Sequence, residues 1–180
     1  MSEAYRLAAA ADAPKLLTII YDAYVTIREL GLHWPAANAD LSLIEDNIEN
    51  NECYVLETDG EIRATVTLSK SGEIRSITDL PFIKWFAADP AYQGQGLGAK
   101  LLGWVEETVI GERLGAPAVT LATAEKHPWL LSMYERRGYE RFFAFETDNG
   151  DGTMHLLLKV IHPERYTEYL RGKADQTAAG

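Results

Sequence analysis

The sequence predicts a single-domain α/β fold with a mixed, mostly antiparallel central sheet and flanking helices. Apolar residues recur every three to four positions in some segments, which is typical of helices with one buried face. In others they alternate with polar residues, which is typical of strands. One strand–helix–strand crossover lies between antiparallel strand pairs, so the sheet is expected to be mixed. The 180 residues contain no internal repeat or linker, which favours one domain.

Helices are expected first. Asp12 is a suitable N-cap, Pro14 fits a first turn where a missing N–H costs little, and Gly31 ends the run. The apolar stripe of this helix consists of Leu16, Ile20, Tyr24, Ile27 and Leu30. After the loop G-L-H-W-P, a second, short helix is expected to begin at residues 38–40.

Strands follow from Cys53 onward. Residues 53–58 and 62–69 flank an Asp59-Gly60 pair, and an Asp-Gly pair between two such runs is a strong hairpin signal. Residues 82–88 are bulky and apolar on both faces, which indicates a central strand of the sheet.

The remaining elements alternate between helix and strand. A helix is expected at 97–114, with Gly115 as its terminator, and a buried strand at 119–123. A further helix starts near His127 and ends at Gly138, and strands at 142–147 and 154–161 close the sheet. The small, polar tail from Gly172 is expected to be disordered, so the predicted domain spans 1–171 and the tail 172–180.

Charge and cysteine content exclude several classes of protein. Lys and Arg total 17 and Asp and Glu total 27, which gives a net charge of −10. Because nucleic-acid binding relies on basic side chains, we expect no nucleic-acid partner. No basic segment with an apolar stretch behind it opens the chain, and no apolar run is long enough to cross a bilayer, so no membrane partner is expected. The single Cys53 suits a reducing cytoplasm, and no metal-ligand set appears.

The segment Q-G-Q-G-L-G-A, Gln93 to Ala99, lies between a predicted strand and a predicted helix. Glycines let the backbone turn sharply and approach a ligand closely, and the first N–H groups of a helix are unpaired at the positive end of its dipole. An anionic group is therefore expected here, with the pyrophosphate of a nucleotide cofactor as the natural candidate.

Three other interpretations of this turn are weaker. A P-loop needs Gly-Lys-Ser/Thr, and Lys100 lies between Ala99 and Leu101. Gly94, Gly96 and Ala99 satisfy the dinucleotide pattern G-x-G-x-x-A, but the acidic residue expected about 20 positions on comes only at Glu125, about ten positions late. A turn that serves only packing would carry three glycines at a heavy cost in entropy.

Two motifs resemble those of the GCN5-related N-acetyltransferases. The stretch I-K-W-F-A-A-D-P-A-Y-Q-G-Q-G-L-G, from Ile83, is similar to the family's strand, link and Q/R-x-x-G-x-G/A signature, with Gln93, Gly96 and Gly98 at its defined positions. Downstream, L-S-M-Y-E-R-R-G-Y, from Leu131, is similar to the L-Y-E-K-x-G-F helix end. The resemblance covers roughly residues 53–158 and implies the acyl-CoA N-acyltransferase fold.

The resemblance implies that acetyl-CoA binds as a co-substrate between the strand before the glycine turn and the strand after it. Backbone groups of three strand residues would pair with the pantetheine arm, and backbone N–H groups of the turn would hold the pyrophosphate. The cofactor-binding residues expected in this way are Phe86, Ala87, Ala88, Gln93, Gly94, Gln95, Gly96, Leu97, Gly98 and Ala99.

The resemblance also implies a catalytic acid. Tyr134 matches the family's tyrosine that protonates the departing thiolate, and an unperturbed phenol with a pKa near 10 suits that role. Packing of the ring in the core is the alternative role. No residue matches a dedicated base, because the inner part of strand 82–88 offers only Lys84. Asp79 and Glu125 are nearby carboxylates, and each is better explained as a solvated loop charge.

Other positions depart from the family pattern or carry less signal. Relatives often have asparagine seven residues before the tyrosine and alanine four before it, where this chain has His127 and Leu130. His127 could contact the cofactor or cap the helix. In the loop that often walls the acceptor site of this family, His33 and Trp34 are candidate substrate contacts.

The acidic turn with Asp148 and Asp151 could approach the same site. Aromatic and acidic groups suit a cationic amine.

The expected function is transfer of acetyl from acetyl-CoA to a primary amine of a small molecule or peptide by direct attack. Cys53, the only thiol that could carry an acetyl-enzyme, opens a strand far from both motifs and suits buried packing. A non-catalytic acyl-CoA-binding or sensing module is the alternative, and an NAD-dependent oxidoreductase is a more distant one. Association into a homodimer stays open.

Overall fold

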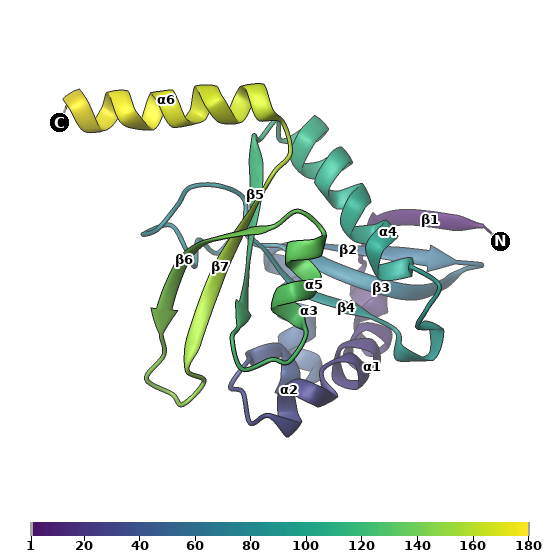
Figure 1. Ribbon diagram of the computed structural model, residues 1–180. Helices are drawn as coiled ribbons and strands as arrows, with labels where there is room; N and C mark the ends of the chain where they lie inside the picture. Colours follow the sequence, from purple (N-terminus) through teal and green to yellow (C-terminus); the bar gives the residue numbers. More distant parts are fainter. Residues whose placement is uncertain (1, 180) are drawn as a thin grey trace.

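Two antiparallel sheets form the centre of the molecule (Figure 1). The computed structural model describes residues 2–179. The first sheet has the strand order β1-β2-β3-β4 and the second the order β5-β7-β6. The strands are β1 (Glu3–Leu7), β2 (Glu52–Thr58), β3 (Glu61–Leu68), β4 (Ile83–Ala88), β5 (Ala118–Ala124), β6 (Glu140–Glu146) and β7 (Thr153–Val160).

Helices cover both faces of the first sheet. The α-helices are α1 (Ala13–Ala23), α2 (Val25–Glu29), α3 (Leu41–Asn50), α4 (Leu97–Trp104), α5 (Leu130–Arg136) and α6 (Pro163–Ala179). Short 3-10 turns occur at Ala10–Asp12, Pro35–Asn38 and Pro90–Tyr92. α1 and α3 pack on one face of the first sheet and α4 on the other.

The two faces bury two separate hydrophobic cores. The first core joins α4 to strands of both sheets and contains Leu101, Val119 and Tyr134. The second core joins α1 to the opposite face and contains Leu16, Ile20 and Ala87. The first sheet is therefore covered on both sides, which explains why the polar positions Thr65 and Thr67 of the central strand β3 are buried as well as its apolar ones.

The two sheets meet at one end of β4 and β5. Phe82 and Thr120 form an isolated parallel bridge, and both the backbone N–H and the hydroxyl of Thr120 donate to the Pro81 carbonyl at 2.8 Å. Beyond this point the two strands separate. The prediction that residues 82–88 form a central strand is therefore wrong, because β4 is the edge strand of its sheet. Its apolar side chains are bulky on both faces because each face packs against one of the two cores.

Several local predictions are confirmed. Asp59 and Gly60 adopt φ of +52° and +81° in the turn between β2 and β3, as a two-residue hairpin turn requires. The short helix expected near residues 38–40 is α3, which starts at Leu41, and Asp40 caps it by accepting from the Leu43 N–H at 2.9 Å. The helix expected at 97–114 does end before Gly115, which has a φ of +62°, but its second half, Val105–Arg113, is π-helical.

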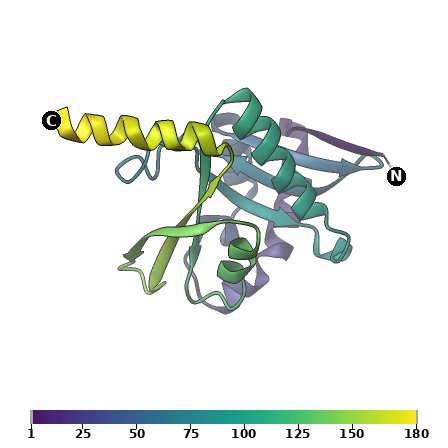
Figure 2. The ribbon, with the colours of Figure 1, turned by 45° about the horizontal axis from the view of Figure 1, so that its top comes forward.

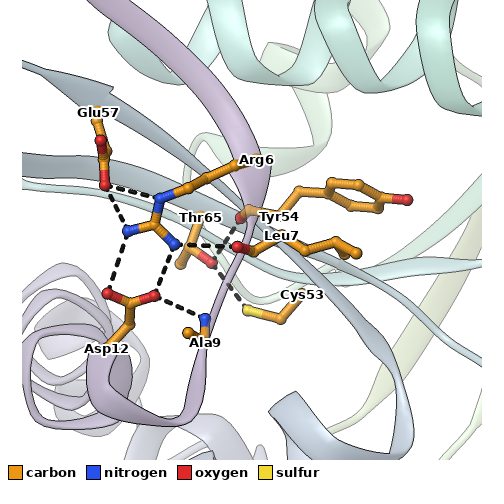
Figure 3. A network of polar contacts seen from close by, with 8 residues as sticks. All are labelled: Arg6, Leu7, Ala9, Asp12, Cys53, Tyr54, Glu57 and Thr65. Atoms are coloured by element: carbon orange, nitrogen blue, oxygen red, sulfur yellow. Dashed lines mark hydrogen bonds and ion pairs between the residues drawn. The ribbon is translucent and has the colours of Figure 1, made fainter.

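The N-terminal segment differs from the prediction in three ways. The expected helix breaks at Tyr24 into α1 and α2, and β1, which the sequence did not indicate, pairs with β2. Asp12 makes no side-chain cap on α1. Its carboxylate instead accepts from Arg6 at 2.7 Å, and Arg6 also donates to Glu57 at 2.8 Å (Figure 3). These ion pairs connect β1 to β2 and to the short turn that precedes α1.

The expected disorder from Gly172 is also wrong, because α6 continues to Ala179 and projects from the body of the molecule (Figure 2). Tyr169 and Lys173 both donate to Asp79, at 2.7 and 3.0 Å, so the helix is anchored on the loop before β4. A single glycine costs a helix only about 1 kcal/mol, which such contacts offset. Residue 180 lies outside the described residues. Among residues 2–179, no helix is long and apolar enough to cross a membrane.

Candidate active site

A cavity of about 560 Å³ opens where β4 and β5 separate. Its walls come from both strands, from α1 and α2 on one side, and from α4 and α5 on the other. Of the sequence-predicted site residues, those that line it are Trp34, Phe86, Ala87, Ala88, Gln93, Gly98, Ala99, His127 and Tyr134. His33 and four residues of the glycine segment, Gly94, Gln95, Gly96 and Leu97, lie outside this lining.

A bulge in β4 shapes the cavity wall. Thr65 pairs with Ala87 and Thr67 with Lys84, so Trp85 and Phe86 together lie opposite a single residue of β3. Trp85 adopts a φ of +55°, in the left-handed region that costs a non-glycine residue about 1–3 kcal/mol. The bulge interrupts the hydrogen bonding between β4 and β3, and the bulged residues line the cavity.

The glycine turn has the geometry expected for an anion site. Gly94 and Gly96 have φ of +85° and +71°, and Gly96 is the N-cap of α4. A Cβ atom at either position would have no neighbour within 4 Å, so the turn is open to a ligand. Gly98 is small for another reason: a Cβ there would lie 3.0 Å from Phe86 Cζ, which lets α4 approach β4 closely.

Tyr134 lies on α5 and is buried against Phe86 and Tyr139, with ring centroids 6.5 and 5.7 Å away. Burial raises the pKa of its phenol above the ordinary value of about 10, and Arg137 only partly offsets this rise. The expectation of an unperturbed phenol is therefore wrong, because the ring is enclosed by the core. Tyr134 keeps its proton at neutral pH and can act only as a donor there.

Tyr24 is a cavity residue that the sequence did not indicate as functional. Its hydroxyl donates to the Phe86 carbonyl at 3.0 Å, across from α1 to the bulged strand. Burial, and then the nearby Tyr134, raise the pKa of Tyr24. In the sequence Tyr24 is one member of an apolar helical stripe, and nothing in that pattern distinguishes it from a core residue.

His127 has the capping role that was one of its two expected roles. Its Nδ1 atom accepts from the Trp129 and Leu130 N–H groups at 3.4 and 3.3 Å, at the start of α5. Burial lowers the pKa of the imidazole, so the ring is neutral at pH 7. Because His127 also lines the cavity, capping and ligand contact are compatible.

The loop after α2, which contains His33 and Trp34, is tied to the turn between β6 and β7. Asp151 accepts from the His33 backbone N–H at 2.9 Å and lies 2.8 Å from its Nδ1. Burial raises the pKa of Asp151, but the contacts with His33 outweigh it and leave the pKa below its ordinary value. Asp148 is exposed and outside the cavity lining. His33 and Asp151 thus hold the loop in place, while Trp34 enters the cavity.

Two polar groups in the cavity wall have no partner among the described residues. The Trp34 Nε1 atom and the Thr123 hydroxyl are both buried and unpaired, and Thr123 itself is fully buried on β5. Buried donors without partners are rare in folded proteins. Both groups are therefore available to a polar ligand in the cavity.

The carboxylates considered from sequence as bases lie elsewhere. Asp79 is paired with α6, and Glu125 lies 3.3 Å from His155 Nε2. Neither lines the cavity, whereas two carboxylates that the sequence did not indicate, Asp22 and Glu73, do. The Cys53 thiol is buried in the second core, 3.4 Å from the Thr65 hydroxyl, and is also outside the cavity.

The fold and site define an acyl-CoA-dependent transferase, and the comparison with known sequences names the family. The sequence model of the Acetyltransferase (GNAT) family matches residues 17–139, so the chain belongs to this family. It is an acetyl-CoA-dependent N-acetyltransferase.

Two relatives come from Bacillus subtilis (strain 168). The chain is 45% identical over 170 residues to an S-alkylcysteine N-acetyltransferase, covering 93% of this chain and 94% of the relative. It is 47% identical over 160 residues to an S-(2-succino)cysteine N-acetyltransferase, covering 88% and 96%. Both are named as enzymes, which does not favour a non-catalytic sensing module.

The fold also matches solved structures. An acetyltransferase-fold protein from Salmonella typhimurium, solved with its cofactor acetyl-CoA, superposes with a TM-score of 0.65 at 14% identity. The match covers 89% of this chain and 95% of that one. At this identity the match concerns the fold, and it confirms the predicted mixed α/β architecture.

Proposed function

We propose that this acetyltransferase transfers acetyl from acetyl-CoA to the α-amino group of S-alkylcysteines. The observation that carries the proposal is the cavity between β4 and β5. It joins the glycine turn and Tyr134 to an apolar wall of α1 and α2 residues that includes Val25 and Ile27. Such a wall suits an S-alkyl group, and the names of the two relatives at 45% and 47% identity support this class of acceptor.

The residues around the glycine turn fit acetyl-CoA, which supplies an acetyl group activated as a thioester. The open turn at Gly94 and Gly96 and the first N–H groups of α4 would hold the pyrophosphate. Backbone groups of residues 86–88, beside the bulge, would pair with the pantetheine arm as an added strand. Arg137 lies beside the same turn, because its guanidinium donates to the Ala99 carbonyl at 3.4 Å. Its Nε atom is buried and has no partner among the described residues, so it would be available to the cofactor.

Tyr134 would act as the general acid. Its hydroxyl is protonated at neutral pH and can donate to a thiolate leaving group, but burial raises its pKa and so makes it a weaker acid than a free phenol. The unpaired Thr123 hydroxyl, on the same face of β5 as Leu121 of the first core, would donate to the oxygen on which negative charge develops. Cys53 is buried in the second core and does not line the cavity, which supports direct attack by the amine.

The acceptor would enter on the side of the second core, beside Trp34. The ammonium group of an amino acid is cationic at neutral pH, and the cavity carboxylates Asp22 and Glu73 would favour it and take up its proton through water. The free thiol of Cys53 suits work in the reducing cytoplasm. A homodimer stays a prediction that light scattering would test.

The test is release of free CoA in the presence of S-ethyl-L-cysteine, with N-acetyl-S-ethylcysteine identified by mass spectrometry. L-alanine, L-cysteine and a short peptide serve as comparison amines. We expect kcat/KM to be highest for the S-ethyl compound. Turnover of the peptide alone, or of none of these amines, would refute the proposed acceptor class.

A melting experiment separates the cofactor from the acceptor. Acetyl-CoA at ~100 times its Kd should stabilise the protein by about 2.7 kcal/mol. For a chain of this size the midpoint should rise by roughly 5–10 °C. NAD should cause no rise.

A further inference from the structure

One cation lines the cavity within the described part of the chain. Among the lining residues, Lys84 is the only lysine or arginine. Its side chain is 19% exposed, and its Nζ atom lies 3.2 Å from Oε2 of Glu73 and 5.4 Å from the centre of the Trp85 ring. The Lys84 ammonium group is therefore largely shielded from solvent, and it forms an ion pair with Glu73 in the cavity wall.

The bulge in β4 determines which face of the strand carries the Lys84 side chain. Ile83 and Phe86 both pack against the first core, although three positions apart, whereas Trp85 and Ala87 pack against the second. In a regular strand Ile83 and Phe86 would point to opposite faces. The extra residue therefore leaves Lys84 and Trp85 together on the side of the second core, which is also the side of Trp34.

We propose that Lys84 binds the α-carboxylate of the acceptor amino acid, and that Glu73 is its counter-ion in the free enzyme. This inference rests on the proposed function. An amino acid carries a carboxylate beside its ammonium group, and the Lys84–Glu73 pair presents the two opposite charges side by side. The substrate can thus replace one ion pair by two, with its carboxylate on Lys84 and its ammonium group facing Glu73.

Two further observations agree with this assignment. A carboxylate brought into an apolar cavity needs a partner of opposite charge, and the lining offers no second cation. The other place for an anion, the N-terminus of α4, lies on the side of the first core, where the pyrophosphate is proposed to bind. The unpaired Trp34 Nε1 would add a second donor on the same side of the cavity as Lys84.

The test compares an acceptor with and without its carboxylate. S-ethyl-L-cysteine and S-ethyl-L-cysteine amide share the amine and the S-substituent, but the amide carries no carboxylate. In Lys84→Met we expect kcat/KM for the acid to fall by ~10- to 100-fold, the range for a hydrogen bond to a charged group, mainly through KM. The value for the amide should be unchanged.

Lys70→Met is the matched control. Lys70 also pairs with a glutamate, Glu52, at 3.3 Å, but it lies outside the cavity lining. It should change neither substrate's kinetics. The melting shift with acetyl-CoA should be the same in the wild type and both variants, which shows that Lys84→Met folds and retains its cofactor site.

Four outcomes would overturn the inference. Unchanged kinetics for the acid in Lys84→Met would show that Lys84 does not bind it. Equal losses for acid and amide would show that Lys84 acts on the fold or the chemistry rather than on the carboxylate. A wild type that acetylates the acid and the amide equally well would show that no carboxylate site exists, with the proposed function intact. A wild type that acetylates neither would overturn both proposals.

Discussion

Tyr134, on α5, is buried in the first core and also lines the cavity. We expect Tyr134→Phe to lower kcat by ~10²-fold or more, as loss of a general acid does, while the melting shift with acetyl-CoA persists. Because burial raises its pKa, the phenol stays protonated well above pH 7, so this group should impose no loss of activity between pH 7 and 10.

The neighbouring Tyr139 provides the control. Its ring lies 5.7 Å from that of Tyr134, but its hydroxyl donates to Glu106 at 2.7 Å, and it does not line the cavity. Tyr139→Phe should therefore lower stability and leave kcat near the wild-type value. A Tyr134→Phe enzyme with wild-type kcat would remove the phenol from the mechanism.

The loop with His33 and Trp34 is joined to the β6–β7 turn through Asp151. Its pKa is below the ordinary value in the folded protein, so its contribution to stability is present above about pH 4 and is lost as the pH falls further. Asp151→Asn should lower the free energy of unfolding by roughly 1–2 kcal/mol at pH 7. It should also raise KM for the acceptor, because His33 and Trp34 lose their anchor.

Thermal unfolding from pH 7 to pH 2 checks this prediction. The difference in stability between wild type and Asp151→Asn should be largest at neutral pH and shrink as the pH falls below 4. Asp148→Asn, at an exposed position of the same turn, should match the wild type throughout. A difference that stays constant with pH would mean that the charge of Asp151 does not stabilise the loop.

The charge of the whole molecule should influence which acceptor is used. The chain carries a net charge of −10, and Lys84 is the one cation among the described cavity residues. S-(2-succino)cysteine has two carboxylates more than an S-alkylcysteine. In the cavity these would contact the apolar wall of α1 and α2 residues, and the net negative charge of the protein would repel them. We expect kcat/KM for S-ethylcysteine to be roughly 10-fold or more higher at low salt.

Added salt should narrow this ratio, because it screens the repulsion of the more anionic acceptor. Steady-state kinetics at two ionic strengths with both acceptors would measure the effect. If S-(2-succino)cysteine is the better acceptor at low salt, a second cation must reach it, and the assignment of Lys84 as the sole anchor is wrong.

Much of the fold could be predicted because it depends on local patterns. The Asp59-Gly60 hairpin, the short helix after residues 38–40 and the end of a helix at Gly115 each follow from a few neighbouring residues. The glycine turn and Tyr134 were recognised because glycine spacing and the tyrosine helix end are continuous in sequence. Local chemistry is sufficient where the residues that act together are adjacent.

The elements that the sequence missed depend on distant partners. The strand β1 forms because β2, some 50 residues away, offers an open edge, and α6 persists because Asp79 holds it. Asp12 has the signature of a helix cap, but Arg6 provides a stronger partner. In each case a tertiary contact outweighs the local preference.

The local sequence thus determined the class of fold, the open glycine turn and the candidate acid, because helix periodicity, glycine spacing and a helix-end motif act over short stretches. Only the tertiary structure brought Tyr24, Glu73, Lys84 and Thr123 into one cavity. That cavity exists because β4 and β5 bond at Phe82 and Thr120 and then separate. Strand separation and a bulge are properties of pairing between distant segments, and they decide which side chains meet the substrate.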